Sequence, residues 1–198
     1  MRFSKLAAAV SLVASVAALP TAHAALITFE GQSNAIYTAA INRAGFLIGN
    51  VAGDEQHFHE ITSTNYGLPN NGTGILLNDR ESRIYVEEQS GADFSLLGVD
   101  VAAALGNAPA LGLTIEGFLN GSSVGVFNIA SLGTGYTAVG ALFGAVDRVV
   151  FDGFGNGGGF VLDNLNVGDA VNGVPVPATL GLALGALFAA GASRRKTR

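Results

Sequence analysis

The chain contains no cysteine and no tryptophan among its 198 residues, and only one methionine. Without cysteine there are no disulfides, so the fold has to be held by its own hydrophobic core. The same absence excludes a thiolate nucleophile and a sulfur-ligated zinc site. Because tryptophan is absent, tyrosine is the residue type that we expect to stack on a sugar ring.

Basic residues are scarce between the two ends of the chain. Four arginines and no lysine stand in residues 25–172, against all fifteen acidic residues, which gives this body a formal net charge of −11. So acidic a domain repels phosphate backbones, which argues against nucleic acid as a partner. The same charge suits divalent cations and a polysaccharide matrix.

The N-terminus has the three parts of a secretory signal peptide. Arg2 and Lys5 form a positive region, residues 6–19 are apolar, and Ala22-His23-Ala24 is an A-x-A cleavage site. The pattern predicts cleavage after Ala24, with Ala22 and Ala24 as the recognised residues. We therefore expect an exported protein.

The C-terminus consists of a proline-containing stretch, an apolar run over residues 178–192 and a basic end. Lys and Arg that flank a membrane span stay on the cytoplasmic side. Counted from Val174, the apolar stretch reaches the roughly twenty residues that cross a bilayer core. This end is predicted to be a hydrophobic helix in the inner membrane.

The order of these three parts resembles the PEP-CTERM sorting signal of Gram-negative bacteria. The resemblance implies processing by an exosortase-like enzyme, an inner-membrane intermediate, and delivery to the cell surface, the outer membrane or the extracellular space. The chain departs from the family at Val176, where glutamate is most common. A plain C-terminal membrane anchor is the alternative. The motif residues are Val174, Pro175, Val176, Pro177, Ala178, Thr179 and Leu180, followed by Arg194, Arg195 and Lys196.

The chain accordingly divides into a signal peptide (1–24), a β-sandwich domain (25–172) and a sorting or anchor segment (173–198). The middle part is long enough to bury one core.

The segments of this middle part between turn signals are short, rich in β-branched or aromatic residues, and about ten in number. Residues 82–87 alternate polar with apolar, as a half-buried strand does. Asn120-Gly121 predicts a tight hairpin. Residues 35–44 fit either a short helix or an irregular segment.

This spacing predicts an all-β, antiparallel jelly-roll β-sandwich. The glycine-rich segment 153–159 joins two predicted strands, so it lacks the helix N-terminus that a phosphate loop needs. A second resemblance is carried by residues 91–96, 113–117, 149–152 and 160–164. In these segments the body resembles the galactose-binding-like jelly rolls of exported PEP-CTERM proteins, which implies a fold more than a ligand.

The sequence offers two candidate metal sites, a histidine pair and an acidic pair. On a strand, His57 and His59 face the same side, where Asp54, Glu55 or Glu60 would complete a zinc or copper site. Two solvent-facing histidines on an edge strand are the simpler interpretation. The jelly-roll resemblance separately implies a structural calcium held by Glu30 and Asp163, because the first and last strands of such folds lie close together. Alternatively, Asp163-Asn164 satisfies backbone groups at a strand kink.

No nucleophile motif such as G-x-S-x-G is present, so we expect a protein that is not an enzyme. The first hypothesis is an exported surface or matrix component, associated with exopolysaccharide or biofilm. The second is a jelly-roll carbohydrate-binding module, with Tyr66 in a Gly- and Asn-rich loop as the sugar contact. A metal-dependent enzyme built on His57 and His59 is the third.

Overall fold

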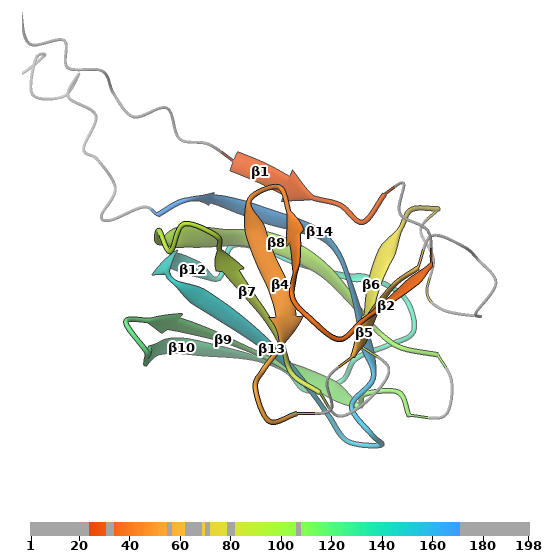
Figure 1. Cartoon of the computed structure of the whole chain (residues 1–198). Helices are drawn as coiled ribbons and strands as arrows, with labels where there is room; N and C mark the ends of the chain where they lie inside the picture. Colours follow the sequence, from red (N-terminus) through yellow and green to blue (C-terminus); the bar gives the residue numbers. More distant parts are fainter. Residues whose placement is uncertain are drawn as a thin grey trace, which may run out of the picture.

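The computed structural model describes residues 24–30, 34–54, 57–61, 69, 72–78, 82–105 and 108–170. Every regular element in these residues is a strand, and all strand pairs among them are antiparallel. The strands form two sheets that pack face to face around one core (Figure 1). The predicted all-β, antiparallel sandwich is therefore confirmed for the described residues.

The larger sheet has eight described strands. Its order is β11-β8-β14-β6-β5-β2, with β1 also paired to β14 and β12 to β8. Its strands are β1 (Ala24–Ile27), β2 (Ala35–Tyr37), β5 (Phe58–Ile61), β6 (Ile75–Asn78), β8 (Phe94–Ala103), β11 (Thr137–Val139), β12 (Phe143–Val146) and β14 (Phe160–Asp169).

The smaller sheet has six described strands in the order β10-β9-β13-β7-β4-β3. Between β6 and β9 the chain alternates from one sheet to the other, so most pairings join segments distant in sequence. Its strands are β3 (Ile41–Arg43), β4 (Phe46–Asn50), β7 (Ile84–Glu88), β9 (Gly112–Leu119), β10 (Ser122–Ile129) and β13 (Arg148–Phe154).

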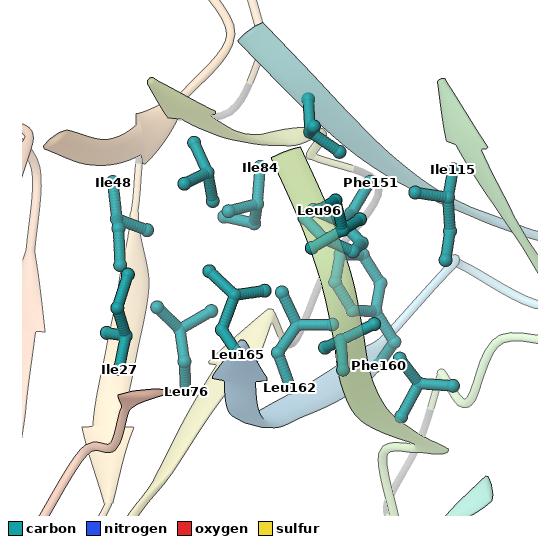
Figure 2. Packing of buried hydrophobic residues seen from close by; sticks show 14 of the residues in the cluster. Ile27, Ile48, Leu76, Ile84, Leu96, Ile115, Phe151, Phe160, Leu162 and Leu165 are labelled. Atoms are coloured by element: carbon teal, nitrogen blue, oxygen red, sulfur yellow. The ribbon is translucent and has the colours of Figure 1, made fainter. Parts of the chain in front are cut away.

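Alternation along the strands puts one side of each sheet into the core. In β7, Ile84 and Val86 are buried between the sheets while Tyr85 and Glu87 point to the outer face. Figure 2 shows Ile84 of β7 in the same cluster as Phe160 and Leu162 of β14. Each fully buried side chain of this size contributes about 1.5–3 kcal/mol of transfer free energy. A core without disulfides is thus built from aliphatic and aromatic side chains.

The first and last strands are neighbours, as expected. Strand β1 pairs with the second half of β14, Leu26 lying opposite Asn166. The first half of β14 pairs with β6 instead. Between the halves the register shifts, and Asn164 has a positive φ of 48°. The kink predicted at Asp163-Asn164 is therefore present, and it lets one long strand serve two neighbours.

Residues 35–44, whose sequence fits either a short helix or an irregular segment, contain the two short strands β2 and β3. Three residues are too few for a period of two to be recognised in the sequence. The predicted hairpin at Asn120-Gly121 is confirmed, with φ values of 52° and 74° joining β9 to β10. Segment 153–159 joins β13 to β14, also as predicted.

Residues 1–23 and 171–198 lie outside the described residues, so the signal peptide and the sorting segment remain predictions. Ala24, the expected cleavage position, is the first residue of β1. Across the described ranges, no helix is long and apolar enough to cross a membrane.

Candidate functional site

The outer face of the six-stranded sheet carries a hollow of about 760 Å³, which we call the trough. Its floor comes from β4, β7, β9 and β13, and its ends are closed by the turns that follow β4, β7, β9 and β12. Four apolar side chains line it, Leu47, Val51, Phe118 and Val150. Its acidic lining residues are Glu87, Glu88, Glu116, Asp147 and Asp152, and its basic ones are Arg83 and Arg148.

Strand register arranges this face in cross-strand rows. One row runs Leu47, Glu87, Arg148, Phe118 from β4 to β9. The next row runs Gly49, Tyr85, Val150, Glu116, and a third places Asp152 opposite Thr114. Directly opposed side chains lie about 4.5–5.5 Å apart at Cβ. The rows therefore put apolar and acidic side chains side by side along the floor.

The middle of the floor is held by Arg148. Its Nε and Nη2 atoms donate to Glu87 Oε2 at 3.0 and 2.7 Å. Its guanidinium carbon also lies 4.9 Å from the ring centroid of Tyr85, within cation–π range. The Tyr85 ring in turn lies over Gly49, where an added Cβ would be 3.0 Å from the ring. Burial, reinforced by Glu87, raises the pKa of Tyr85. The guanidinium of Arg148 therefore contacts both Glu87 and Tyr85.

The β4 end of the trough is fixed by a second arginine. Arg83 donates from Nε and Nη2 to Asp54, both at 3.0 Å, and its backbone N–H donates to the same carboxylate at 2.8 Å. The hydrogen bonds from the Arg83 side chain lower the pKa of Asp54. This bidentate pair ties the turn after β4 to the start of β7.

Carboxylates also hold the turns at the opposite end. Glu88 accepts hydrogen bonds from the backbone N–H groups of Ser90 at 2.7 Å and Ala92 at 3.2 Å. The hydrogen bond from the Ser90 hydroxyl lowers the pKa of Glu88. Asp147 accepts from the backbone N–H of Asn120 in the β9–β10 turn. Both rims of the trough are therefore rigidly tied before any ligand arrives.

Two acidic side chains in the trough bind neither an arginine nor a turn. Glu116 and Asp152 make no hydrogen bond or ion pair within the part of the chain that the structure describes. Burial raises the pKa of Asp152, and the charges of Asp54 and Glu116 add to this while Arg83 opposes it. These two carboxylates are the acceptors available to a ligand.

The sequence reading missed this site. Its signal was the alternation in β7, β9 and β13, where every second residue is polar or bulky on a face that needs no core contact. The alternation in residues 82–87 predicts a half-buried strand, but nothing local in the sequence indicates that β9 and β13 lie in the same sheet as β7. The trough depends on that adjacency.

The residues predicted to hold calcium meet at one short segment. Glu30 accepts a hydrogen bond from the backbone N–H of Gly74 at 3.1 Å, and Asp163 accepts one from the Thr73 hydroxyl at 2.7 Å. Asp163 is fully buried and also accepts the N–H of Asn164 at 2.7 Å, as the kink alternative expects. No group of three or more potential metal ligands occurs in the described ranges. Calcium binding stays a prediction.

The two histidines do face the same side, with ring centroids 5.4 Å apart in an edge-on arrangement. Asp54, one expected co-ligand, is bound by Arg83 at the other sheet. Glu60 lies between the sheets, on the opposite side of β5 from His59, and is bound by Arg43. Glu55, and the proposed sugar contact Tyr66, fall outside the described residues.

Comparisons with known proteins add a set of structural similarities. No protein-family model matches the chain, and no curated protein sequence matches it significantly. A variant of a family 29 carbohydrate-binding module complexed with mannohexaose superposes with a TM-score of 0.41 and 12% identity, over 74% of this chain and 91% of that chain. A family 29 module from Piromyces equi gives a TM-score of 0.41 and 11% identity, over 75% and 90%.

The CBM22-1 and GH10 modules of a Clostridium thermocellum xylanase, complexed with xylohexaose, give a TM-score of 0.39 and 15% identity. That alignment covers 75% of this chain and 29% of the longer one. At TM-scores this low, the fold is argued from the strand pairing above, and no ligand is carried over to this chain.

Proposed function

We propose that the protein is a non-enzymatic polysaccharide-binding protein of jelly-roll type, which takes a sugar chain along the trough of the six-stranded sheet. The observation that carries this proposal is the trough itself, about 760 Å³ of open volume with rigid ends. Ligand sites are concave, usually preformed, and combine apolar surface with a few convergent polar groups. The trough has each of these properties.

The lining suits the two kinds of surface that a sugar ring presents. Phe118 is partly exposed and offers apolar area to the C–H face of a pyranose, with the largely buried Val150 also in the lining. Aromatic contact of this kind is favourable. Glu116 and Asp152 are hydrogen-bond acceptors with no partner among the described residues, and hydroxyl groups are donors. A hydroxyl-rich polymer therefore satisfies the trough better than an apolar ligand does.

Export and surface delivery belong to the same proposal and rest on the two terminal segments. The signal peptide would deliver the domain across the inner membrane, and the PEP-CTERM-like tail would direct it to an exosortase-like enzyme and then to the surface or matrix. A polysaccharide-binding domain at that location would attach the protein to exopolysaccharide.

The test is affinity electrophoresis and calorimetry of the purified full chain with a panel of soluble polysaccharides. The variant is Phe118→Ala, matched by Phe127→Ala, which removes an equally large, exposed side chain outside the trough. We expect Phe118→Ala to weaken binding about five- to tenfold, the loss of one aromatic contact. Phe127→Ala should bind as the parent does.

Three results would contradict the proposal. Absence of binding to every polysaccharide removes it. Binding that survives Phe118→Ala but is lost in Tyr66→Ala moves the site to the loop that contains Tyr66. Release of new reducing ends during incubation would show that the protein is an enzyme.

A further inference from the structure

The trough is acidic although two arginines line it. Five of its lining residues are carboxylates, and both arginines already have carboxylate partners, Arg83 with Asp54 and Arg148 with Glu87. Neither guanidinium is therefore available as the principal contact for an anionic sugar. The whole body has the same sign of charge, with four arginines against fifteen acidic residues. A uronic or sulfated polymer would enter a negative field without a free cation to meet it.

The two carboxylates without partners, Glu116 and Asp152, lie on adjacent strands of the same floor. Glu116 is opposite Val150 on β13, and Asp152 is two residues further along that strand, so both point outward. Diagonal neighbours of this kind are within reach of long side chains. The two carboxylates also interact electrostatically, since the charge of Glu116 contributes to the raised pKa of Asp152.

The two neighbouring carboxylates face an open hollow and repel each other, and Arg83, which attracts Asp152, is already bound to Asp54. A cation between the two carboxylates would relieve the repulsion. A metal is one such cation, but no cluster of three or more His, Cys, Asp or Glu ligands is found in the described ranges. An ammonium group carried by the ligand is another. It would donate charge-assisted hydrogen bonds to carboxylates that otherwise have only water as donor. The apolar strip of Phe118 and Val150 beside them would receive the ring of the same sugar.

We propose that the trough selects polysaccharides built from hexosamines whose amino groups are free, with Glu116 and Asp152 as the residues that determine this specificity. The inference rests on the proposed polysaccharide-binding function and names its ligand class. Acetylation of the amine removes the positive charge and adds bulk at the same position. An N-acetylated polymer should therefore keep the apolar contact and its hydroxyl hydrogen bonds but lose the charge-assisted ones, and an anionic polymer should bind least.

The experiment compares two ligands of equal length, a glucosamine hexasaccharide and its fully N-acetylated form, with the purified full chain below the pH at which the amine loses its proton. An oligogalacturonate of the same length is the anionic comparison. Glu116→Gln, Asp152→Asn and the double variant remove charge without removing size. Asp93→Asn, an exposed acidic residue outside the trough lining, removes the same charge elsewhere.

The parent protein should bind the free-amine hexasaccharide about tenfold more tightly than the acetylated one, an advantage that falls as salt is added. Each single variant should reduce this ratio about threefold, as expected for partly exposed charge pairs, and the double variant should abolish it. Affinity for the acetylated form should stay within about twofold in all variants, because the Gln and Asn side chains keep an oxygen that accepts hydrogen bonds from hydroxyl groups.

The outcomes separate this inference from the function on which it rests. Phe118-dependent binding of the acetylated or another neutral polymer, with no preference for the amine, overturns the specificity and leaves the function intact. A preference that Asp93→Asn reduces as much as Glu116→Gln shows only a general charge effect and also overturns it. Binding abolished by EDTA assigns the contact to a bridging metal instead. Absence of binding to every polymer overturns both proposals.

Discussion

The side chain of Arg43, on one edge of the six-stranded sheet, donates to both carboxylate oxygens of Glu60 on the facing sheet, with Nε to Oε1 at 2.7 Å. Glu60 is fully buried, and Tyr37 donates its hydroxyl to Oε2 at 2.8 Å. The hydrogen bonds with Glu60 raise the pKa of Arg43, and burial followed by Glu60 raises that of Tyr37. One buried acid thus links β2, β3 and β5 across the sandwich.

Removal of Arg43 should therefore be strongly destabilising. In Arg43→Ala, the Glu60 carboxylate stays buried without its cation, and breaking a buried pair in this way costs about 3–5 kcal/mol. Urea unfolding at neutral pH measures the change. The matched control is Arg148→Ala, which breaks an exposed pair and should cost below about 1 kcal/mol. Equal losses of unfolding free energy in the two variants would show that the buried inter-sheet pair contributes no more to stability than the exposed pair.

The charged carboxylate of Asp54 should stabilise the fold at neutral pH, and this contribution should be lost in acid. Its pKa is lowered by Arg83, so the folded state favours the charged carboxylate. That stability is present above the unfolded pKa of about 3.9 and is lost as the pH falls through the lower folded value. We expect Asp54→Asn to be less stable than the parent at pH 7, with the difference shrinking at about pH 3. Urea unfolding at both pH values measures it.

The charged carboxylate of Asp152 should destabilise the fold at neutral pH, the opposite of the effect of Asp54. Burial raises its pKa, so the folded state disfavours the charged form. Asp152→Asn is expected to stabilise the protein at pH 7, by less than about 1 kcal/mol because the side chain is partly exposed. The gain should fade as the pH falls through the folded pKa and the carboxyl is protonated in both states. The same urea series measures it, and a loss of stability at pH 7 would contradict the assignment.

Gly74 should not tolerate a side chain. A Cβ at this position would lie 2.1 Å from the carbonyl oxygen of Phe29, a backbone atom with no freedom to move aside. Gly74→Ala should therefore destabilise by several kcal/mol, in the range of about 3–5 known for severe packing defects. Gly140→Ala, with no heavy atom within 4 Å of its Cβ, is the control. Thermal unfolding distinguishes the two, and a tolerated Gly74→Ala would show that β1 and β6 separate easily.

If calcium binds at Glu30 and Asp163, it should raise the melting temperature, because a ligand of the folded state adds stability in proportion to the logarithm of its concentration. EDTA should reverse the shift, and Glu30→Gln should abolish it. Glu88→Gln, an acid at the far sheet, serves as the control. A melting temperature that calcium leaves unchanged would favour the alternative, in which Asp163 only satisfies backbone groups at the kink.

Intact mass of the protein recovered from its host, by cell fraction, tests the two terminal segments. Sorting predicts a mature form that lacks residues 1–24 and everything beyond about residues 174–177, found outside the inner membrane. A plain anchor predicts a form that retains Arg198 and stays in the inner membrane. The second result would remove surface delivery from the proposal and leave the trough unaffected.

The local features of the fold were predictable because they depend on neighbouring residues. Asn120-Gly121 specifies its hairpin through positive φ, and residues 82–87 specify a strand through alternation. The placement of β1 beside β14 was expected from the fold class and is present. Strands β2 and β3 were not recognised, because three residues carry too little pattern and their stability comes from partners such as β5 and β4.

By itself, the sequence determined the class of the domain: short alternating segments without cysteine fold as a disulfide-free, all-β sandwich, and its acidic body disfavours anionic partners. Only the tertiary structure decided which strands became neighbours, because pairing is a long-range choice that no local pattern encodes. That choice placed Arg43 against Glu60 between the sheets. It also placed Glu116 and Asp152, from strands separated by three others in the chain, on one open floor.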